Sequence, residues 1–184
     1  MPIANPYPDD WRALTDFCYL GPLSLIRPPA LLLDRIGEDG DYVVNQDYDV
    51  ALRIDGDSRV ITVPRGLITD LTSVPRPLRW FVGRVGPWLE AAIVHDWLYV
   101  AWQVTGRTPT ARDRLFADDV MLLAMTSAGI GPIQRRAIHL AVRLFGGRGF
   151  FAKNHPIFAD LSAAIYDTPI VIPTEPDQRG GTGS

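Results

Sequence analysis

Three side chains able to do acid–base or metal chemistry lie close together in the apolar run from Ala91 to Tyr99. They are His95, Asp96 and Tyr99. On a helix, His95 and Tyr99 share a face, and Asp96 is turned by about 100° from His95. Burying these groups costs free energy unless each finds a partner. The run is therefore either a satisfied structural network or a reactive site.

Asp113, which follows in the next predicted helix, is the candidate partner of the imidazole. Thr108 and Pro109 indicate the start of that helix, because Thr favours the N-cap and Pro the first turn. This start places Asp113 on the inward face, within reach of His95 across an antiparallel helix pair. If Thr110 is the N-cap instead, Asp113 occupies N3 and capping alone explains it. We favour Thr108.

These assignments predict a water-activating centre. His95 is the base, Asp113 fixes its tautomer, and Tyr99 supports the network. Asp96, with backbone carbonyls, is the candidate ligand for a hard cation such as calcium. The alternative is that the same side chains only brace two helices by hydrogen bonds.

A neighbouring loop, Thr69–Pro75, contributes Asp70 and Ser73 as candidate site residues. They add a carboxylate or a hydroxyl to the His95 cavity, or they satisfy local backbone N–H groups as turn residues. Two other histidines, His139 and His155, have no acid-rich sequence around them, so we assign neither as a ligand.

The net charge of −3 is unevenly distributed. Residues 59–84 contain five arginines against the single acid Asp70, and residues 130–156 contain basic residues and no acid. This asymmetry suggests a face toward an anionic partner, with Arg76, Arg79 and Arg84 as candidate anion-binding residues. The alternative is a set of arginines solvated on separate surfaces.

Local patterns place these residues in an α+β fold. Strand-like runs at 42–45, 48–53 and 59–63 predict a small antiparallel sheet in the N-terminal half, with a hairpin turn at 54–57. Before them, we expect a proline-rich segment with one short strand at 30–33. Three helices follow, at 87–104, 108–127 and 132–145, and the antiparallel pair carries the His-Asp motif. Residues 1–168 should form one globular domain, and residues 169–184 an extended or disordered C-terminal arm.

The third predicted helix is amphipathic, with arginines on one side and the aromatic pair Phe150–Phe151 soon after it. Such a helix suits a membrane surface or lipid, although an ordinary packed helix with a solvated face has the same pattern. Nucleic-acid binding has only the basic segments in its favour, and we do not expect it.

Composition fits an ordinary globular protein, because 47% of the 184 residues are hydrophobic and 21% are charged. One cysteine, Cys18, leaves no internal disulfide and favours a reducing compartment. The N-terminus has no signal-peptide pattern, and no apolar run matches a membrane span. We therefore expect the cytoplasm as the place of synthesis.

Four segments together resemble a family of unknown function that is common in tailed bacteriophages and prophages. They are VPRGLITDLTSVPR at 63–76, HDWLY at 95–99, ARDRLF at 111–116 and AVRLFG at 141–146. The resemblance implies a phage or prophage origin, other phage proteins as partners, and association with the virion.

His-Asp-x-x-Tyr on one helix, followed by an aspartate opening the next, resembles the core of secreted phospholipase A2; DRLFADDVM at 113–121 extends the match. The resemblance implies that His95 is the general base, that Asp96 binds calcium and that Asp113 orients the histidine. The chain lacks the disulfides, the signal peptide and a clear glycine-rich calcium loop of that family.

Two functions therefore remain open for a phage-encoded protein with a His/Asp site on a helix pair. One is metal-assisted ester hydrolysis of the phospholipase A2 kind. The other is a non-catalytic structural role in the virion or tail.

Overall fold

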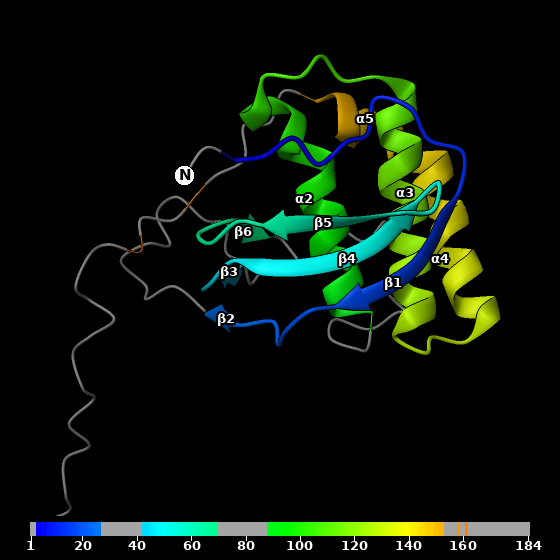
Figure 1. The fold of residues 1–184 in the computed structure, drawn as a ribbon, viewed down its shortest axis with the longest axis horizontal. Coiled ribbons are helices and arrows are strands. Elements are labelled where there is room, and N and C mark those ends of the chain that lie inside the picture. The colour runs from blue at the N-terminus through cyan, green and yellow to red at the C-terminus, as the bar shows by residue number, and fades with distance from the viewer. Residues whose placement is uncertain (1–2, 27–41, 70–87, 153–157, 159–160, 162–184) are drawn as a thin grey trace, which may run out of the picture.

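The structure, a computed structural model, describes residues 3–26, 42–69, 88–152, 158 and 161. Within them, strands occupy the N-terminal half and helices follow, which confirms the α+β class (Figure 1). The strands form two three-stranded antiparallel sheets rather than the single sheet predicted, and a short fourth helix follows the three expected. The elements are β1 (Leu14–Tyr19), β2 (Leu25–Ile26), β3 (Tyr42–Val44), β4 (Tyr48–Ile54), β5 (Asp57–Val63), β6 (Ile68–Thr69), α2 (Leu89–Thr105), α3 (Ala111–Ser127), α4 (Pro132–Phe145) and α5 (Gly147–Phe151).

The larger sheet has the order β1-β4-β5 and is built around the predicted hairpin. Asp55 and Gly56 both have positive φ angles, 53° and 97°, and Ile54 pairs with Asp57 across the turn. Positive φ at both central residues matches the right-handed twist of the two strands, which explains the Asp-Gly pair. The smaller sheet has the order β2-β3-β6.

Strand β1 was not expected, because its segment was interpreted as loop. It pairs antiparallel with β4, but the register shifts between Thr15 and Cys18, and Asp16 has a φ of 54°. Such a bulge interrupts the two-residue alternation by which a strand is recognised in sequence. The strand predicted at 30–33 lies outside the described residues, as does the predicted arm at 169–184.

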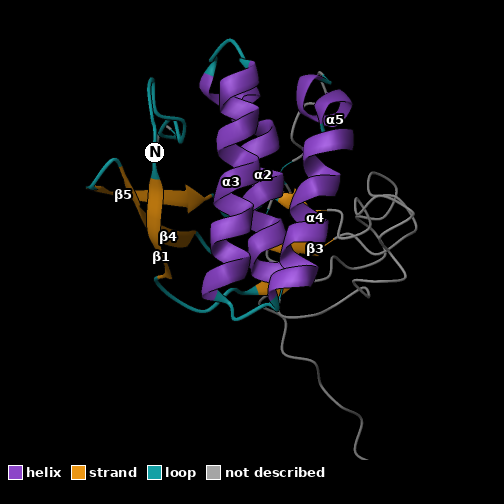
Figure 2. Cartoon of the chain, turned by 90° about the vertical axis from the view of Figure 1, so that its right-hand side faces the viewer, coloured by secondary structure: helices purple, strands orange, loops and turns teal. Residues whose placement is uncertain are grey.

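The helices cover the larger sheet in layers (Figure 2). Helices α2 and α3 pack against each other, α3 packs on β1, and α4 packs on α3. Figure 2 shows α4 on the side of the α2–α3 pair that faces away from the larger sheet. None of the described helices is both long and apolar enough to cross a membrane.

The core between these layers is apolar and aromatic. It contains fully buried side chains from the sheet, from α2 and from α3, among them Leu52, Ile61, Trp97, Leu98 and Phe116. Burial on this scale is the main favourable contribution to folding.

The N-terminal segment crosses the helices before it enters β1. Tyr7 is 1% exposed, and its hydroxyl donates a hydrogen bond to the carbonyl of Leu98 in α2. Asp9 pairs with Arg107 at 3.0 Å, just beyond the end of α2. At the far end of the hairpin, Asp55 accepts hydrogen bonds from the backbone of Arg12 and Ala13.

Helix α3 begins two residues later than predicted. Its N-cap is Thr110, whose hydroxyl accepts from the Asp113 N–H at 3.1 Å, while the Asp113 carboxylate accepts from the Thr110 N–H at 2.9 Å. This capping box satisfies two backbone donors at once, so it defines the start more strongly than the Thr108–Pro109 pair. Helix α2 ends at Gly106, which has a φ of 70°.

Candidate functional site

His95 of α2 is hydrogen-bonded to Asp118 of α3. Nε2 of the imidazole lies 3.1 Å from Oδ1 of the carboxylate. Asp118 is completely buried, and His95 is 6% exposed. The Tyr99 hydroxyl, one turn after His95 on the same face, donates to the same Oδ1 at 2.7 Å. The inward phase predicted for His95 and Tyr99 is thus present, with a different carboxylate at its centre.

The other carboxylate oxygen of Asp118, Oδ2, faces the guanidinium groups of two arginines. Nη1 of Arg114, one turn earlier in α3, is 3.5 Å from Oδ2, and Nε of Arg143 in α4 is 3.7 Å from it. Arg114 also donates to the backbone carbonyl of Arg143 at 3.0 Å, near the negative end of α4. A buried carboxylate that faces two guanidinium groups is held as an acceptor of hydrogen bonds.

The hydrogen bond to Asp118 determines the tautomer of His95. Because Asp118 accepts, Nε2 of the imidazole must donate, so neutral His95 carries its proton on Nε2 and a lone pair on Nδ1. Within the described residues, Nδ1 makes no hydrogen bond. A histidine held in this way is equipped to take a proton at Nδ1.

Tyr99 donates a hydrogen bond to Asp118 and keeps its proton. Burial first, and then the negative charge of Asp118, raise the pKa of the Tyr99 hydroxyl well above its ordinary value. The phenol therefore remains a hydrogen-bond donor to Asp118 rather than a nucleophile.

The predicted pairing of Asp113 with His95 is wrong. The Asp113 carboxylate is occupied by the capping box with Thr110 and by Arg107, whose Nη2 lies 3.0 Å from Oδ1. In an antiparallel pair, a residue near the start of α3 lies opposite the last turn of α2. His95 is in the second turn of α2, so its partner must lie further along α3. Asp118, about 7 Å along the axis from Asp113, satisfies that condition.

Asp96 points to a different neighbour. The Thr69 hydroxyl, at the end of β6, donates to its Oδ2 at 2.7 Å, and Asp96 is half-buried. Calcium takes six to eight oxygen ligands. In the part of the chain that the structure describes, no group of three or more His, Cys, Asp or Glu side chains could hold a metal ion. The role of Asp96 as a calcium ligand stays a prediction.

The other predicted site residues lie outside the described residues, in the segment between β6 and α2. They are Asp70 and Ser73 of the candidate site loop and the candidate anion-binding residues Arg76, Arg79 and Arg84.

A second histidine–aspartate pair lies on the other side of α3. Nε2 of His139 in α4 is 3.0 Å from Oδ1 of Asp119, and the Arg143 guanidinium bonds the same oxygen. Burial of the Asp119 carboxyl tends to raise its pKa, but the bonds from His139 and Arg143 outweigh that effect and hold the pKa below its ordinary value. The sequence around His139 gave no sign of this pair, because the acid comes from another helix.

Gly146, at the end of α4, lets Tyr99 reach Asp118. A Cβ atom at this position would lie 2.3 Å from the Tyr99 hydroxyl oxygen and 2.6 Å from the Val142 carbonyl oxygen. Real Cβ atoms do not approach that closely. The glycine is therefore required by the close contact between α4 and the site.

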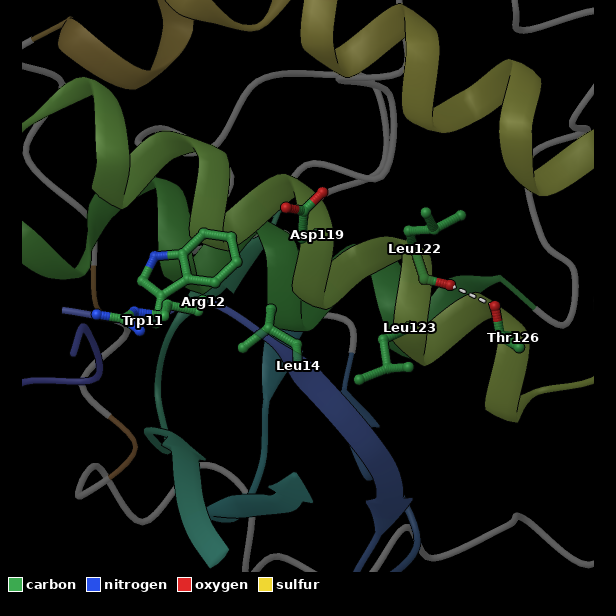
Figure 3. A pocket seen from close by; sticks show the side chains of 7 residues that line it. All are labelled: Trp11, Arg12, Leu14, Asp119, Leu122, Leu123 and Thr126. Atoms are coloured by element: carbon green, nitrogen blue, oxygen red, sulfur yellow. Dashed lines mark hydrogen bonds between the residues drawn. The ribbon is translucent and has the colours of Figure 1, made fainter. Parts of the chain in front are cut away.

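A crevice of about 320 Å³ lies between the start of β1 and α3 (Figure 3). Asp119 lies at its edge, whereas His95, Tyr99 and Asp118 do not line it. The crevice thus belongs to the side of α3 that carries the Asp119 pair. Its lining residues are Trp11, Arg12, Leu14, Asp119, Leu122, Leu123 and Thr126.

The fold and these contacts define an α+β protein with a buried His–Asp–Tyr cluster between two antiparallel helices. Residues 43–142, more than half of the chain, match the family described as Protein of unknown function (DUF1353), and the chain belongs to this family. The match includes His95, Tyr99, Asp118 and Asp119. Neither the curated proteins nor the solved structures contain a match.

Proposed function

We propose that this protein is a phage-encoded hydrolase in which His95 activates water for attack on an ester. The observation that carries the proposal is the bond from Nε2 of His95 to the buried Asp118, which leaves the Nδ1 lone pair available. The phage assignment rests on the four sequence segments that resemble the phage and prophage family.

The roles implied by the phospholipase A2 resemblance carry over with one change. Asp118 takes the place assigned to Asp113, because it is the carboxylate that bonds both His95 and Tyr99. Tyr99 and the two arginines hold the carboxylate in position, so the imidazole orientation is fixed before substrate binds.

In this reaction His95 alone takes up and returns the proton. Nδ1 takes a proton from water as the water oxygen bonds to the ester carbonyl carbon. When the tetrahedral intermediate collapses, the bond to the alcohol oxygen breaks, and the imidazolium returns the proton to that oxygen. Asp118 keeps its negative charge throughout and stabilises the transient imidazolium.

The structural alternative also has an observation in its favour. Asp118 is completely buried and its partners come from three places in the chain: α2, α3 itself and α4. The cluster would then serve to lock the helices of a virion or tail component.

Hydrolysis of phospholipid vesicles and short-chain esters by purified protein separates the two. The assay is run with calcium and with chelator, comparing wild type with His95→Gln. We expect His95→Gln to lower the rate by about 10²- to 10⁴-fold, the usual contribution of a general base. Asp96→Asn should weaken any dependence on calcium.

His139→Gln is the matched control, because His139 also pairs with an aspartate of α3 but on the other side of the helix. It should leave the rate within a few-fold of wild type. If wild type hydrolyses none of the substrates, or if His95→Gln remains fully active, the hydrolase proposal fails and the structural role takes its place.

A further inference from the structure

The outward side of α4 and α5 carries large apolar side chains in contact with solvent. The exposed fractions run from 47% for Phe151 to 81% for Ile133. Large exposed apolar side chains that gather on neighbouring elements mark an interaction site more often than scattered single residues do. We call this set the α4–α5 patch: Ile133, Leu140, Leu144, Phe145 and Phe151.

Helix geometry shows that the patch is separate from the core. Ile133, Leu140 and Leu144 follow one another at spacings of seven and four residues, so they line up within about 40° on one face. Of the buried residues of α4, Ile138 lies about 140° around the helix from Ile133 and Ala141 about 80°, so both are off the line of the three exposed side chains. The helix is thus apolar on two sides, and only one of them is needed for folding.

The patch is wider than the seam of a single partner helix. Phe145 is turned by about 100° from Leu144, and Phe151 comes from α5. A seam for one partner helix needs only a narrow stripe of apolar residues. Figure 2 shows α4 on the side of α2 and α3 that faces away from the larger sheet, and exposed apolar side chains spread around such a helix suit an extended planar partner better.

The charged residues in the stretch of sequence that carries the patch are all of one sign. Residues 130–152 contain four arginines and no acidic residue, in a chain whose net charge is −3. Arg136 and Arg148 are exposed, and within the described residues neither makes an ion pair or a hydrogen bond. A second copy of the chain would bring like charges together, whereas anionic headgroups would neutralise them.

From this combination we infer that the α4–α5 patch is a binding surface for anionic membranes. The apolar side chains enter the boundary between headgroups and acyl chains, and Arg136 and Arg148 contact the lipid phosphates. This attachment goes beyond the proposed hydrolysis and does not depend on it, because the polar contacts that hold His95 and Asp118 involve none of the patch residues.

Co-sedimentation with vesicles tests the inference. Wild-type protein should bind phosphatidylglycerol vesicles and not phosphatidylcholine vesicles, and added salt should weaken the binding. The triple variant Ile133→Gln/Leu140→Gln/Leu144→Gln should lose binding by at least about tenfold, since three apolar side chains no longer insert. Arg136→Gln should weaken binding by about fivefold.

Leu20→Gln is the matched control, because Leu20 is 52% exposed but lies after β1, outside the patch. It should bind as wild type does, and so should His95→Gln. Circular dichroism checks that each variant is folded. Absence of wild-type binding to phosphatidylglycerol, or full binding by the folded triple variant, overturns the inference. So does a wild-type dimer that the triple variant converts to monomer, since the patch is then an interface between copies.

Discussion

Asp118 and Asp119 are adjacent in α3, yet their carboxylates bind histidines of different helices. Asp118 bonds His95 of α2 at 3.1 Å, and Asp119 bonds His139 of α4 at 3.0 Å. Successive residues of a helix point about 100° apart, so one turn of α3 can bond to both α2 and α4. The Arg143 guanidinium lies close to both carboxylates and links the pairs.

Substituting the two aspartates one at a time should give very different losses of stability. Asp118→Asn leaves Arg114 and Arg143 partly buried beside a neutral amide, and we expect the free energy of unfolding to fall by about 3–5 kcal/mol. Asp119 is 29% exposed at its side chain, so Asp119→Asn should cost about 1 kcal/mol or less. Urea denaturation of both variants measures the difference. Equal losses would show that burial does not distinguish the two pairs.

Gly146→Ala should destabilise the protein through the contact with Tyr99. The added Cβ would overlap the Tyr99 hydroxyl and the Val142 carbonyl, and such overpacking typically costs about 1–3 kcal/mol. In the Tyr99→Phe background the loss should be smaller, because one of the two overlapping atoms is gone. Thermal unfolding of the single and double variants measures this coupling.

The neighbouring Gly147 provides the control for that experiment. A Cβ at Gly147 meets no atom within 4 Å, so Gly147→Ala should leave the midpoint of unfolding nearly unchanged. If the two alanine variants lose the same stability, helix-end conformation rather than the Tyr99 contact is responsible.

Acid should remove the contribution of Asp119. Its pKa is lower in the folded protein than in the unfolded chain, so folding is favoured when the carboxyl is ionised. The contribution is complete above about pH 5, where the carboxyl is ionised in both states, and is lost as pH falls through the folded pKa. The stability difference between wild type and Asp119→Asn should therefore shrink between about pH 5 and pH 2. A difference that stays constant over this range contradicts the assignment.

The capping box gives a prediction about Asp113. Thr110→Ala should cost about 1 kcal/mol through the lost N-cap, and Asp113→Ala more, because it also removes the partner of Arg107. Ester hydrolysis by folded Asp113→Ala should stay close to wild type, whereas Asp118→Asn should lower it sharply. The reverse order would restore Asp113 as the partner of His95.

How much of the fold could be predicted depends on the range of the interactions. The β4–β5 hairpin was predictable because Asp55 and Gly56 determine the turn locally. Strand β1 was not, since a bulge at Asp16 interrupts its alternation and its partner β4 lies far along the chain.

In the site, too, the features determined by local sequence were predictable and those determined by distant segments were not. The shared face of His95 and Tyr99 follows from helix periodicity and was predicted correctly. The choice of carboxylate depends on how two helices slide past each other, which local spacing does not determine. Counting back from the turn between α2 and α3 would have favoured Asp118 over Asp113.

The contacts of the N-terminal segment also determine an order of events during folding. Tyr7 bonds the carbonyl of Leu98, ninety-one positions later, and Asp9 pairs with Arg107. Tyr7 and Asp9 therefore have no binding surface until α2 has been synthesised and packed. Closing loops of this length is slow compared with forming a helix hairpin. The segment that leads into β1 is thus synthesised before α2 but reaches its native place after it, and until β1 has paired, the edge of β4 that it covers is open to pairing with other chains.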